Sequence, residues 1–354
     1  LTDHFATRNP QAWTECWEKP TRRARKTSCG TFGCRDKSRT MADMLAETVL
    51  GWVQEDALPL ALGHRPPPLL PSLREMPPST PPDWQPGSSN RAVVISGMHR
   101  SGTSVLANLL QAMGISVGSR LMEATEFNAK GYFEDLDFQE LHESIIDASH
   151  HGFLHRDLEG RHLQITAAHK DRAKGLADRR QDLSLWGWKD PRTSLFLDMW
   201  DEVLPGAVYV FIYRDPAQVV HSLRRRQDPE LMVNLPGASL LDPLLRKLGV
   251  DRFRTQRAVD MWTYYNRRIV QFARTNPERC LLINVANLMD SFAAMTRCMQ
   301  EQWRLPVREI DPSQVFDQSL MQGRGPEDLR RVCAAKPEVG ALFTELESLS
   351  ISTS

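Results

Sequence analysis

The chain has 354 residues, of which 41% are hydrophobic and 25% charged, with 44 basic and 44 acidic side chains. This composition predicts a folded core, and the zero net charge excludes an overall field that would attract nucleic acid or an anionic membrane. No run approaches the ~20 apolar residues of a membrane span, no secretory leader stands at the start, and the six cysteines lack paired spacing, so we expect free thiols and a cytoplasmic location.

The first segment, residues 1–87, is predicted to be a disordered, proline-rich tail. Residues 66–86 contain too many prolines for a helix or a strand, whereas residues 41–58 suit one amphipathic helix. The first methionine is Met41, so one hypothesis is that residues 1–40 are upstream sequence; the alternative is a disordered native tail. The intact mass of the natively expressed protein distinguishes the two.

From residue 91 onward, predicted strands alternate with predicted helices. Short apolar runs predict buried strands at 91–97, 115–118, 207–214 and 280–285. Helical spacing of apolar residues predicts helices at 103–114, 136–149, 165–183, 215–226 and 251–275. This alternation indicates the α/β class, with a three-layer, P-loop-type fold whose central parallel sheet has helices on both faces. We expect this domain at 88–310, with 311–354 as its helical C-terminal extension.

The sequence GMHRSGTS, residues 97–104, joins the first strand to the first helix, as a phosphate-binding loop does. Glycines let the backbone approach a phosphate, and helix-start amides point at the anion. A loop that hydrolyses ATP or GTP places lysine after its second glycine, whereas Thr103 stands here and the cation is Arg100. We therefore expect no metal; the alternative is a turn that binds nothing. The candidate ligand-binding residues are Gly97, His99, Arg100, Ser101, Gly102, Thr103 and Ser104.

A second candidate anion site lies in YRDPAQVVHSL, residues 213–223. Arg214 ends the strongest predicted strand, at the edge where open α/β sheets bind ligands, and Ser222 follows about two helical turns into the next helix. A guanidinium and a hydroxyl together suit a phosphate monoester. The alternative is a strand-end arginine that binds neighbouring carbonyls. Two phosphate sites on one sheet edge favour a nucleotide with phosphate at both ends of its sugar.

These two motifs resemble those of the sulfotransferase superfamily, whose donor is 3′-phosphoadenosine 5′-phosphosulfate. The loop at 97–104 is similar to that family's 5′-phosphosulfate loop, and residues 213–223 to its 3′-phosphate motif. WGWKDPRTSLFLDMW, residues 186–200, resembles the lysine segment of bacterial sulfotransferase-like proteins and of tyrosylprotein sulfotransferases. NAKGYFED, residues 128–135, is similar to a segment of bacterial members. The resemblance implies sulfonate transfer from that donor to a hydroxyl or amine.

Such a transfer needs groups that stabilise negative charge and a base that removes the acceptor's proton. The position of Arg100 in the loop predicts a guanidinium at the transferring group. The resemblance places Lys189 near the bridging oxygen and a glutamate or histidine base just past the second strand. Glu134 is the predicted base, because the aromatic residues next to it in the sequence favour partial burial of its carboxyl. Glu123 and Glu126 remain alternative candidates for the base.

Other features give weaker predictions. His151 and His155 have metal-ligand spacing, but an exposed turn is favoured. Trp262, Tyr264 and Tyr265 are expected in the core, with adenine stacking as the alternative, and Arg324 with Gly325 is a weaker candidate for a closing loop. Residues 227–258 are expected to form a mobile lid over a small-molecule, carbohydrate or lipid acceptor. A P-loop kinase or nucleotidase of atypical sequence, and a non-catalytic nucleotide-binding relative, remain alternative functions; the oligomeric state stays open.

Overall fold

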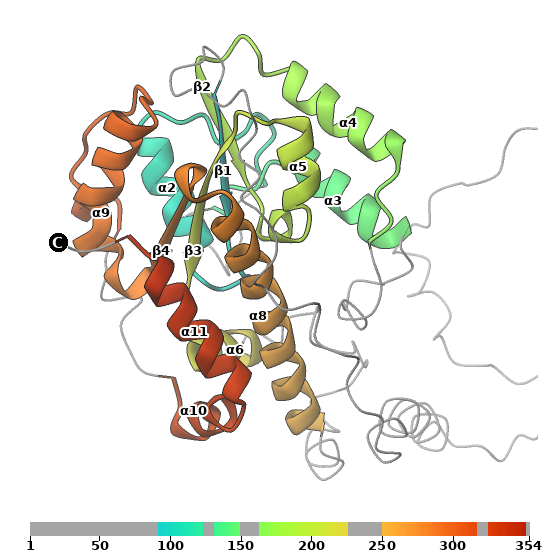
Figure 1. Cartoon of the computed structure of the whole chain (residues 1–354), viewed down its shortest axis with the longest axis vertical. Coiled ribbons are helices and arrows are strands. Elements are labelled where there is room, and N and C mark those ends of the chain that lie inside the picture. The colour runs from blue at the N-terminus through green and yellow to red at the C-terminus, as the bar shows by residue number, and fades with distance from the viewer. Residues whose placement is uncertain (1–90, 123–130, 149–162, 226–249, 317–324, 352–354) are drawn as a thin grey trace, which may run out of the picture. The chain divides into compact units, whose positions relative to one another are not determined.

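A four-stranded parallel sheet forms the centre of the part of the chain that the structure describes (Figure 1). The structure is a computed structural model, and it describes residues 91–122, 131–148, 163–225, 250–316 and 325–351. The spatial order of the strands is β2-β1-β3-β4, and every neighbouring pair runs parallel. The strands are β1 (Arg91–Ser96), β2 (Leu185–Lys189), β3 (Val208–Tyr213) and β4 (Cys280–Asn284).

Helices cover both faces of the sheet, as the alternation along its strands requires. Successive residues of β3 alternate between two buried apolar clusters: Val210 belongs to one, and Tyr209 and Phe211 to the other. The Val210 cluster is completed by α2 (Thr103–Ala112) and α9 (Leu288–Arg297). The predicted three-layer α/β fold is therefore confirmed.

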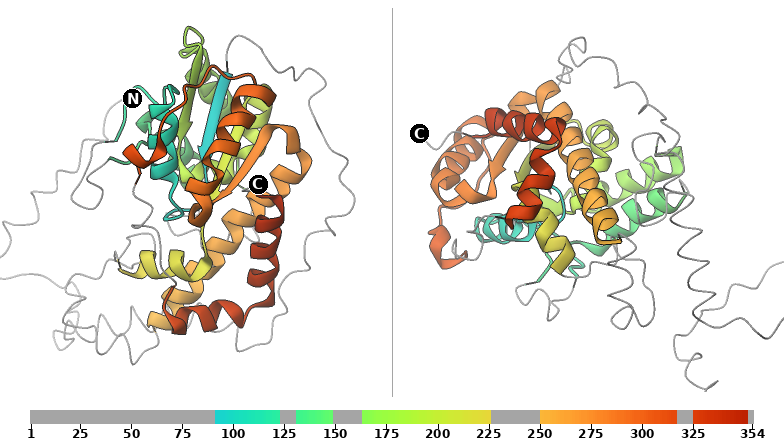
Figure 2. Two further views of the ribbon diagram at one scale, coloured as in Figure 1. Left: turned by 90° about the vertical axis from the view of Figure 1, so that its left-hand side faces the viewer. Right: turned by 90° about the horizontal axis from the view of Figure 1, so that it is seen from below.

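The second cluster, on the Tyr209 side, is larger, and the remaining α-helices of the described residues contribute to it. Figure 2 shows the backbone of these helices in two further views. The long helix α8 contributes Trp262 and Tyr265, both fully buried, so their predicted core position is confirmed, whereas Tyr264 is only partly buried against the same cluster. The helices of this side are α3 (Leu136–Ala148), α4 (Ala167–Asp178), α5 (Leu197–Val203), α6 (Pro216–Arg225), α8 (Val250–Thr275), α10 (Glu327–Ala334) and α11 (Pro337–Leu349).

Short helices occupy several turns between these elements. The 3₁₀ helix η3 (Pro191–Leu195) matters most here because it follows β2 directly, and Asp190 caps its start by accepting a hydrogen bond from the backbone N–H of Arg192 at 2.8 Å. The others are η4 (Pro277–Arg279), η5 (Val285–Asn287), the π-helical turn η6 (Cys298–Gln302) and η7 (Pro312–Gln314).

Most of the predicted helices and strands are present in the structure, but some segments differ from their predictions. The strand predicted at 115–118 is wrong: the segment makes one parallel bridge, between Ser116 and Trp186, and no strand. The strand β2 was not predicted. The helix predicted at 165–183 is shorter in the structure, where it is α4. The predicted lid at 227–258 overlaps the start of α8, which begins at Val250; the rest of it lies outside the described residues, so the lid stays a prediction.

Of three other sequence-based predictions, two fall outside the described part of the chain and one reaches into it. The tail at 1–87 and the histidines at 150–155 lie outside it, as does Arg324. Gly325 packs against α6, where an added Cβ would come within 2.7 Å of the Ala217 side chain. Among the described helices, none is both long enough and apolar enough to cross a membrane.

Candidate functional site

The loop between β1 and α2 lies at the carboxyl end of the central strand, between the ends of β2 and β3. Its backbone packs tightly, because a Cβ on Gly97 would lie 2.1 Å from the Ile212 carbonyl oxygen. Gly102 has φ 97°, a left-handed conformation that starts α2 with no side-chain cap on its first turn. The Ser101 hydroxyl is fully buried and has no hydrogen-bond partner among the described residues. Uncapped helix-start amides and a buried hydroxyl fit the predicted phosphate site.

Arg100 belongs to a corner of the site that it shares with Arg214 and Ser222. Its Nε donates a hydrogen bond to Ser222 Oγ at 3.1 Å, and its carbonyl oxygen accepts one from Arg214 Nη1 at 3.4 Å. Arg214 Nε also donates to Gln218 Oε1 at 2.7 Å, and burial lowers the pKa of its guanidinium. Since a half-buried pair of guanidiniums favours an anion, this anion corner (Arg100, Arg214 and Ser222) suits a phosphate.

Lys189 lies in a second cluster, on the α2 side of the loop. Its ammonium donates to Glu134 Oε1 at 2.6 Å, to the Tyr132 carbonyl oxygen at 3.1 Å and to Ser104 Oγ at 3.4 Å. Lys189 is only 2% exposed, at the carboxyl end of β2. The structure thus brings Lys189, Glu134 and Ser104 together, although they come from separate segments of the sequence.

Glu134 is held by the segment that carries it. Its backbone carbonyl accepts a hydrogen bond from the Met122 N–H at 2.8 Å, and Phe133, just before it, has the left-handed φ of 57°. Asp135, just after it, is fully buried and forms an ion pair with Arg180 at 2.6 Å. Glu134 is therefore fixed on both sides. The alternative bases, Glu123 and Glu126, lie outside the described residues.

The predicted site residues fall into two groups that the loop connects. Arg100 lies with the anion corner, whereas Ser104, at the start of α2, lies with Lys189 and Glu134. The catalytic role predicted for Arg100 stays a prediction; its Nε donates to Ser222 in the anion corner. His99 lies beside Tyr265, with ring centroids 5.8 Å apart.

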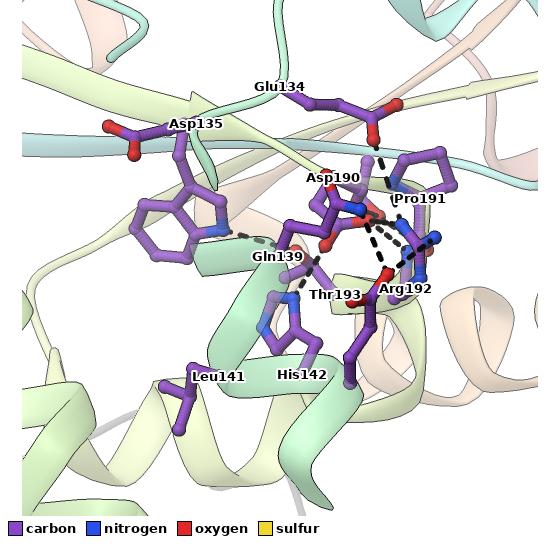
Figure 3. A network of polar contacts seen from close by, with 12 residues as sticks. Glu134, Asp135, Gln139, Leu141, His142, Asp190, Pro191, Arg192 and Thr193 are labelled. Atoms are coloured by element: carbon purple, nitrogen blue, oxygen red, sulfur yellow. Dashed lines mark hydrogen bonds and ion pairs between the residues drawn. The ribbon is translucent and has the colours of Figure 1, made fainter. Parts of the chain in front are cut away.

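A buried network behind Glu134 was missed at the sequence level (Figure 3). Asp190 accepts from Arg192 Nη1 at 3.2 Å, and its other oxygen lies 2.8 Å from His142 Nδ1. The backbone carbonyls of Asp190 and Pro191 accept from Ser96 Oγ, which ties this turn to the end of β1. The K-D-P-R sequence placed Asp190 and Arg192 beside Lys189, but no sequence signal joined them to His142.

Asp190 should make the fold sensitive to acid. Burial alone would raise the pKa of this carboxyl, but the Arg192 charge and the His142 hydrogen bond outweigh burial and hold the pKa below its ordinary value of 3.8. A carboxyl with a depressed folded pKa stabilises the fold above its unfolded pKa, and this stabilisation is lost as the pH falls through the folded value. We expect Asp190→Ala to lower the free energy of unfolding by about 3–5 kcal/mol at pH 7.

Urea unfolding of the wild type and of Asp190→Ala checks this expectation. The difference between the two proteins should shrink as the pH falls below about 4, where the Asp190 carboxyl takes up a proton in the unfolded chain but stays charged in the folded protein. The exposed Asp198→Ala is the matched control and should cost less than about 1 kcal/mol, because it breaks only a surface ion pair with Arg268. A pH-independent difference for Asp190→Ala would contradict the proposed charge.

Comparison with known proteins identifies one family across most of this domain. The model of a family described as "Sulfotransferase family" matches residues 92–309. Among solved structures, the sulfotransferase domain from the curacin biosynthetic pathway is 16% identical, covering 73% of this chain and 98% of that one, with a TM-score of 0.40.

Two further solved structures are similar to the same degree. The sulfotransferase domain of the Synechococcus PCC 7002 olefin synthase is 16% identical, covering 75% of this chain and 97% of that one, with a TM-score of 0.39. Sulfotransferase STF9 from Mycobacterium avium is 16% identical, and the match covers 74% of this chain and 76% of that one, with a TM-score of 0.40. No curated protein matches the sequence.

Proposed function

The chain belongs to the sulfotransferase family, and from that premise we propose that it transfers a sulfonate group from 3′-phosphoadenosine 5′-phosphosulfate to a hydroxyl or amine acceptor without a metal. The observation that carries the proposal is the pair of clusters on either side of one phosphate-binding loop. The anion corner suits the 3′-phosphate, and Lys189 with Ser104 suits the sulfonate end of the same nucleotide.

The fixed cations of the site support a metal-independent reaction. In the transfer, the bond between sulfur and the bridging oxygen breaks and its electron pair stays on the 5′-phosphate oxygen, while the acceptor oxygen or nitrogen bonds to sulfur. Lys189 would neutralise the charge that develops on the bridging oxygen, because a preorganised cation in a buried site stabilises developing charge strongly. Ser104 Oγ accepts from Lys189 Nζ at 3.4 Å and donates to the Tyr132 carbonyl at 3.2 Å, and it would turn from that carbonyl to donate to the sulfonate.

Glu134 is the proposed general base. Its Oε1 lies 2.6 Å from Lys189, so one carboxylate is adjacent to the group that would contact the transferring sulfonate. In this role Glu134 takes the acceptor's proton as the new bond to sulfur forms. We further propose a cytoplasmic location, and an acceptor that is a small molecule, a carbohydrate or a lipid.

Donor binding is the first expected result. Adenosine 3′,5′-bisphosphate should bind with micromolar affinity by calorimetry, and Arg214→Ala should weaken this binding at least tenfold, since a charge-assisted contact to phosphate is worth about 1.5–3 kcal/mol. The exposed Arg331→Ala is the control and should leave affinity unchanged.

The nucleotide controls separate the alternatives. 5′-AMP, which lacks the 3′-phosphate, should bind at least tenfold more weakly than the bisphosphate. Preferential binding of ATP with Mg²⁺ would point to a kinase or nucleotidase and reject the proposed donor. Tight bisphosphate binding, with no turnover of the phosphosulfate on a panel of hydroxyls and amines, would identify a non-catalytic relative.

A further inference from the structure

The carboxylate of Glu134 is shared between two buried cations. Lys189 Nζ lies 2.6 Å from its Oε1, and Arg192 Nη1 lies 3.6 Å from its Oε2. Both cations are almost fully enclosed, with exposures of 2% for Lys189 and 6% for Arg192. Each oxygen of Glu134 therefore faces its own positive charge, and the two charges come from residues only three positions apart.

Arg192 is itself held rigidly. Asp190 Oδ1 accepts from the Arg192 backbone N–H at 2.8 Å and from its Nη1 at 3.2 Å, while Nη2 lies 3.2 Å from Glu143 Oε1. Gln139 Nε2 in turn donates to Glu143 Oε1 at 2.9 Å. A planar guanidinium that binds carboxylates on several edges has little freedom to turn (Figure 3).

The charge of Asp190 is fixed from behind by His142. An indole N–H can only donate, so the Trp200 Nε1 contact at 2.9 Å makes His142 Nε2 an acceptor. The imidazole proton therefore lies on Nδ1 and donates to Asp190 Oδ2 at 2.8 Å. With His142 neutral, the buried cations Lys189 and Arg192 face the buried carboxylates Glu134 and Asp190, and Arg192 also pairs with the partly exposed Glu143.

This arrangement changes when the donor binds. If Lys189 turns to the sulfonate, as the proposed function requires, Glu134 loses its closest partner and keeps Arg192 as its one cation among the described residues. We propose that Arg192 is a positioning residue for the transfer, which keeps the Glu134 carboxylate oriented while Lys189 contacts the donor. The inference rests on the proposed function.

The test compares Arg192→Met, Arg192→Lys and the double variant Asp190→Asn/Arg192→Met with the wild type. The double variant also neutralises Asp190, the buried carboxylate that loses its charged partner in Arg192→Met, and it serves as the test if the single variant does not fold. The kcat of each variant is measured as the rate at which the phosphosulfate is converted to adenosine 3′,5′-bisphosphate, with the hydroxyl or amine acceptor that gives the highest wild-type rate. Calorimetry gives the affinity for adenosine 3′,5′-bisphosphate. Arg331→Met, on the exposed face of α10, is the matched control.

The expected result separates rate from binding. Arg192→Met and the double variant should lower kcat roughly 10- to 100-fold, the scale of a misplaced catalytic group, while affinity for the bisphosphate stays within about twofold. Arg192→Lys should recover part of the loss, because one ammonium can still face Glu134. A kcat within twofold of wild type, a parallel loss of donor affinity, or no recovery with lysine overturns the inference.

Crystal structures test the role of Arg192 independently of the proposed function. In crystals of Arg192→Met with the phosphosulfate bound and no acceptor, so that Lys189 faces the donor, the Glu134 carboxylate should leave the position that it keeps in wild-type crystals with the same donor. Absence of wild-type turnover would reject the proposed function alone, and the position of Glu134 would then decide on Arg192. A carboxylate that stays in place rejects the positioning role.

Discussion

Replacing Lys189 with methionine is expected to lower kcat about 10²–10³-fold, the usual effect of removing one preorganised group that stabilises transition-state charge. Methionine has nearly the same length and keeps the buried volume filled, but it carries no charge. Affinity for adenosine 3′,5′-bisphosphate should stay within about threefold, because the anion corner of Arg100, Arg214 and Ser222 is unchanged. Single-turnover bisphosphate release and calorimetry measure the two quantities.

The matched control for this change is Lys174→Met. Lys174 forms an exposed ion pair with Asp178 within α4, so its loss should leave both kcat and affinity unchanged. Retention of most activity by Lys189→Met would show that another cation faces the bridging oxygen. Loss of bisphosphate affinity along with kcat would instead give Lys189 a role in ground-state binding.

Local sequence patterns predicted most of the sheet and its flanking helices. The β-branched run before Gly97 and the apolar run 207–214 are typical of buried parallel strands, and both form strands at the centre of the sheet. β2 was missed because its sequence, LWGWK, has two tryptophans, a glycine and a lysine in place of a β-branched run. Its strand conformation depends on the pairing with β1, a long-range contact that local propensity does not contain.

The sequence predicted where some residues of the candidate site lie, but not the contacts that others make. The loop and Arg214 could be predicted because each lies at a strand end, where the position in the chain determines the position in space. The contact of Arg100 with Ser222 could not, since it depends on the φ of 68° at Arg100, an uncommon conformation for an arginine. His142, which contacts Asp190, lies on α3, and Trp200, which donates to His142, lies on α5, so only the packing of those helices places them.

The fold connects the loop to the Lys189 group through one buried serine. Ser96 Oγ lies 2.8 Å from Ser194 Oγ and donates to the Asp190 carbonyl at 3.0 Å. The end of β1, which starts the phosphate-binding loop, is thereby joined to the turn that carries Lys189 and Arg192. A rigid connection of this kind favours transfer, because the donor and the group that stabilises its charge must keep one relative position.

Glu134→Gln is expected to lower kcat about 10²–10⁴-fold, the range for loss of a general base, with bisphosphate affinity unchanged. The amide keeps the size of the carboxylate but cannot take a proton, and the exposed Glu202→Gln, which loses only a surface pair with Lys170, should be fully active. If Glu134→Gln keeps wild-type activity, Glu134 is not the base, and Glu123 or Glu126 becomes the candidate.

A series of phenol acceptors of increasing acidity separates the two large effects. A more acidic phenol gives up its proton with less help, so the rate loss caused by Glu134→Gln should shrink along the series. The loss caused by Lys189→Met should persist, because charge develops on the bridging oxygen whichever acceptor attacks. Rates of bisphosphate release that fall in parallel for both variants would mean that Glu134 serves to hold Lys189, through their 2.6 Å contact, and not to accept a proton.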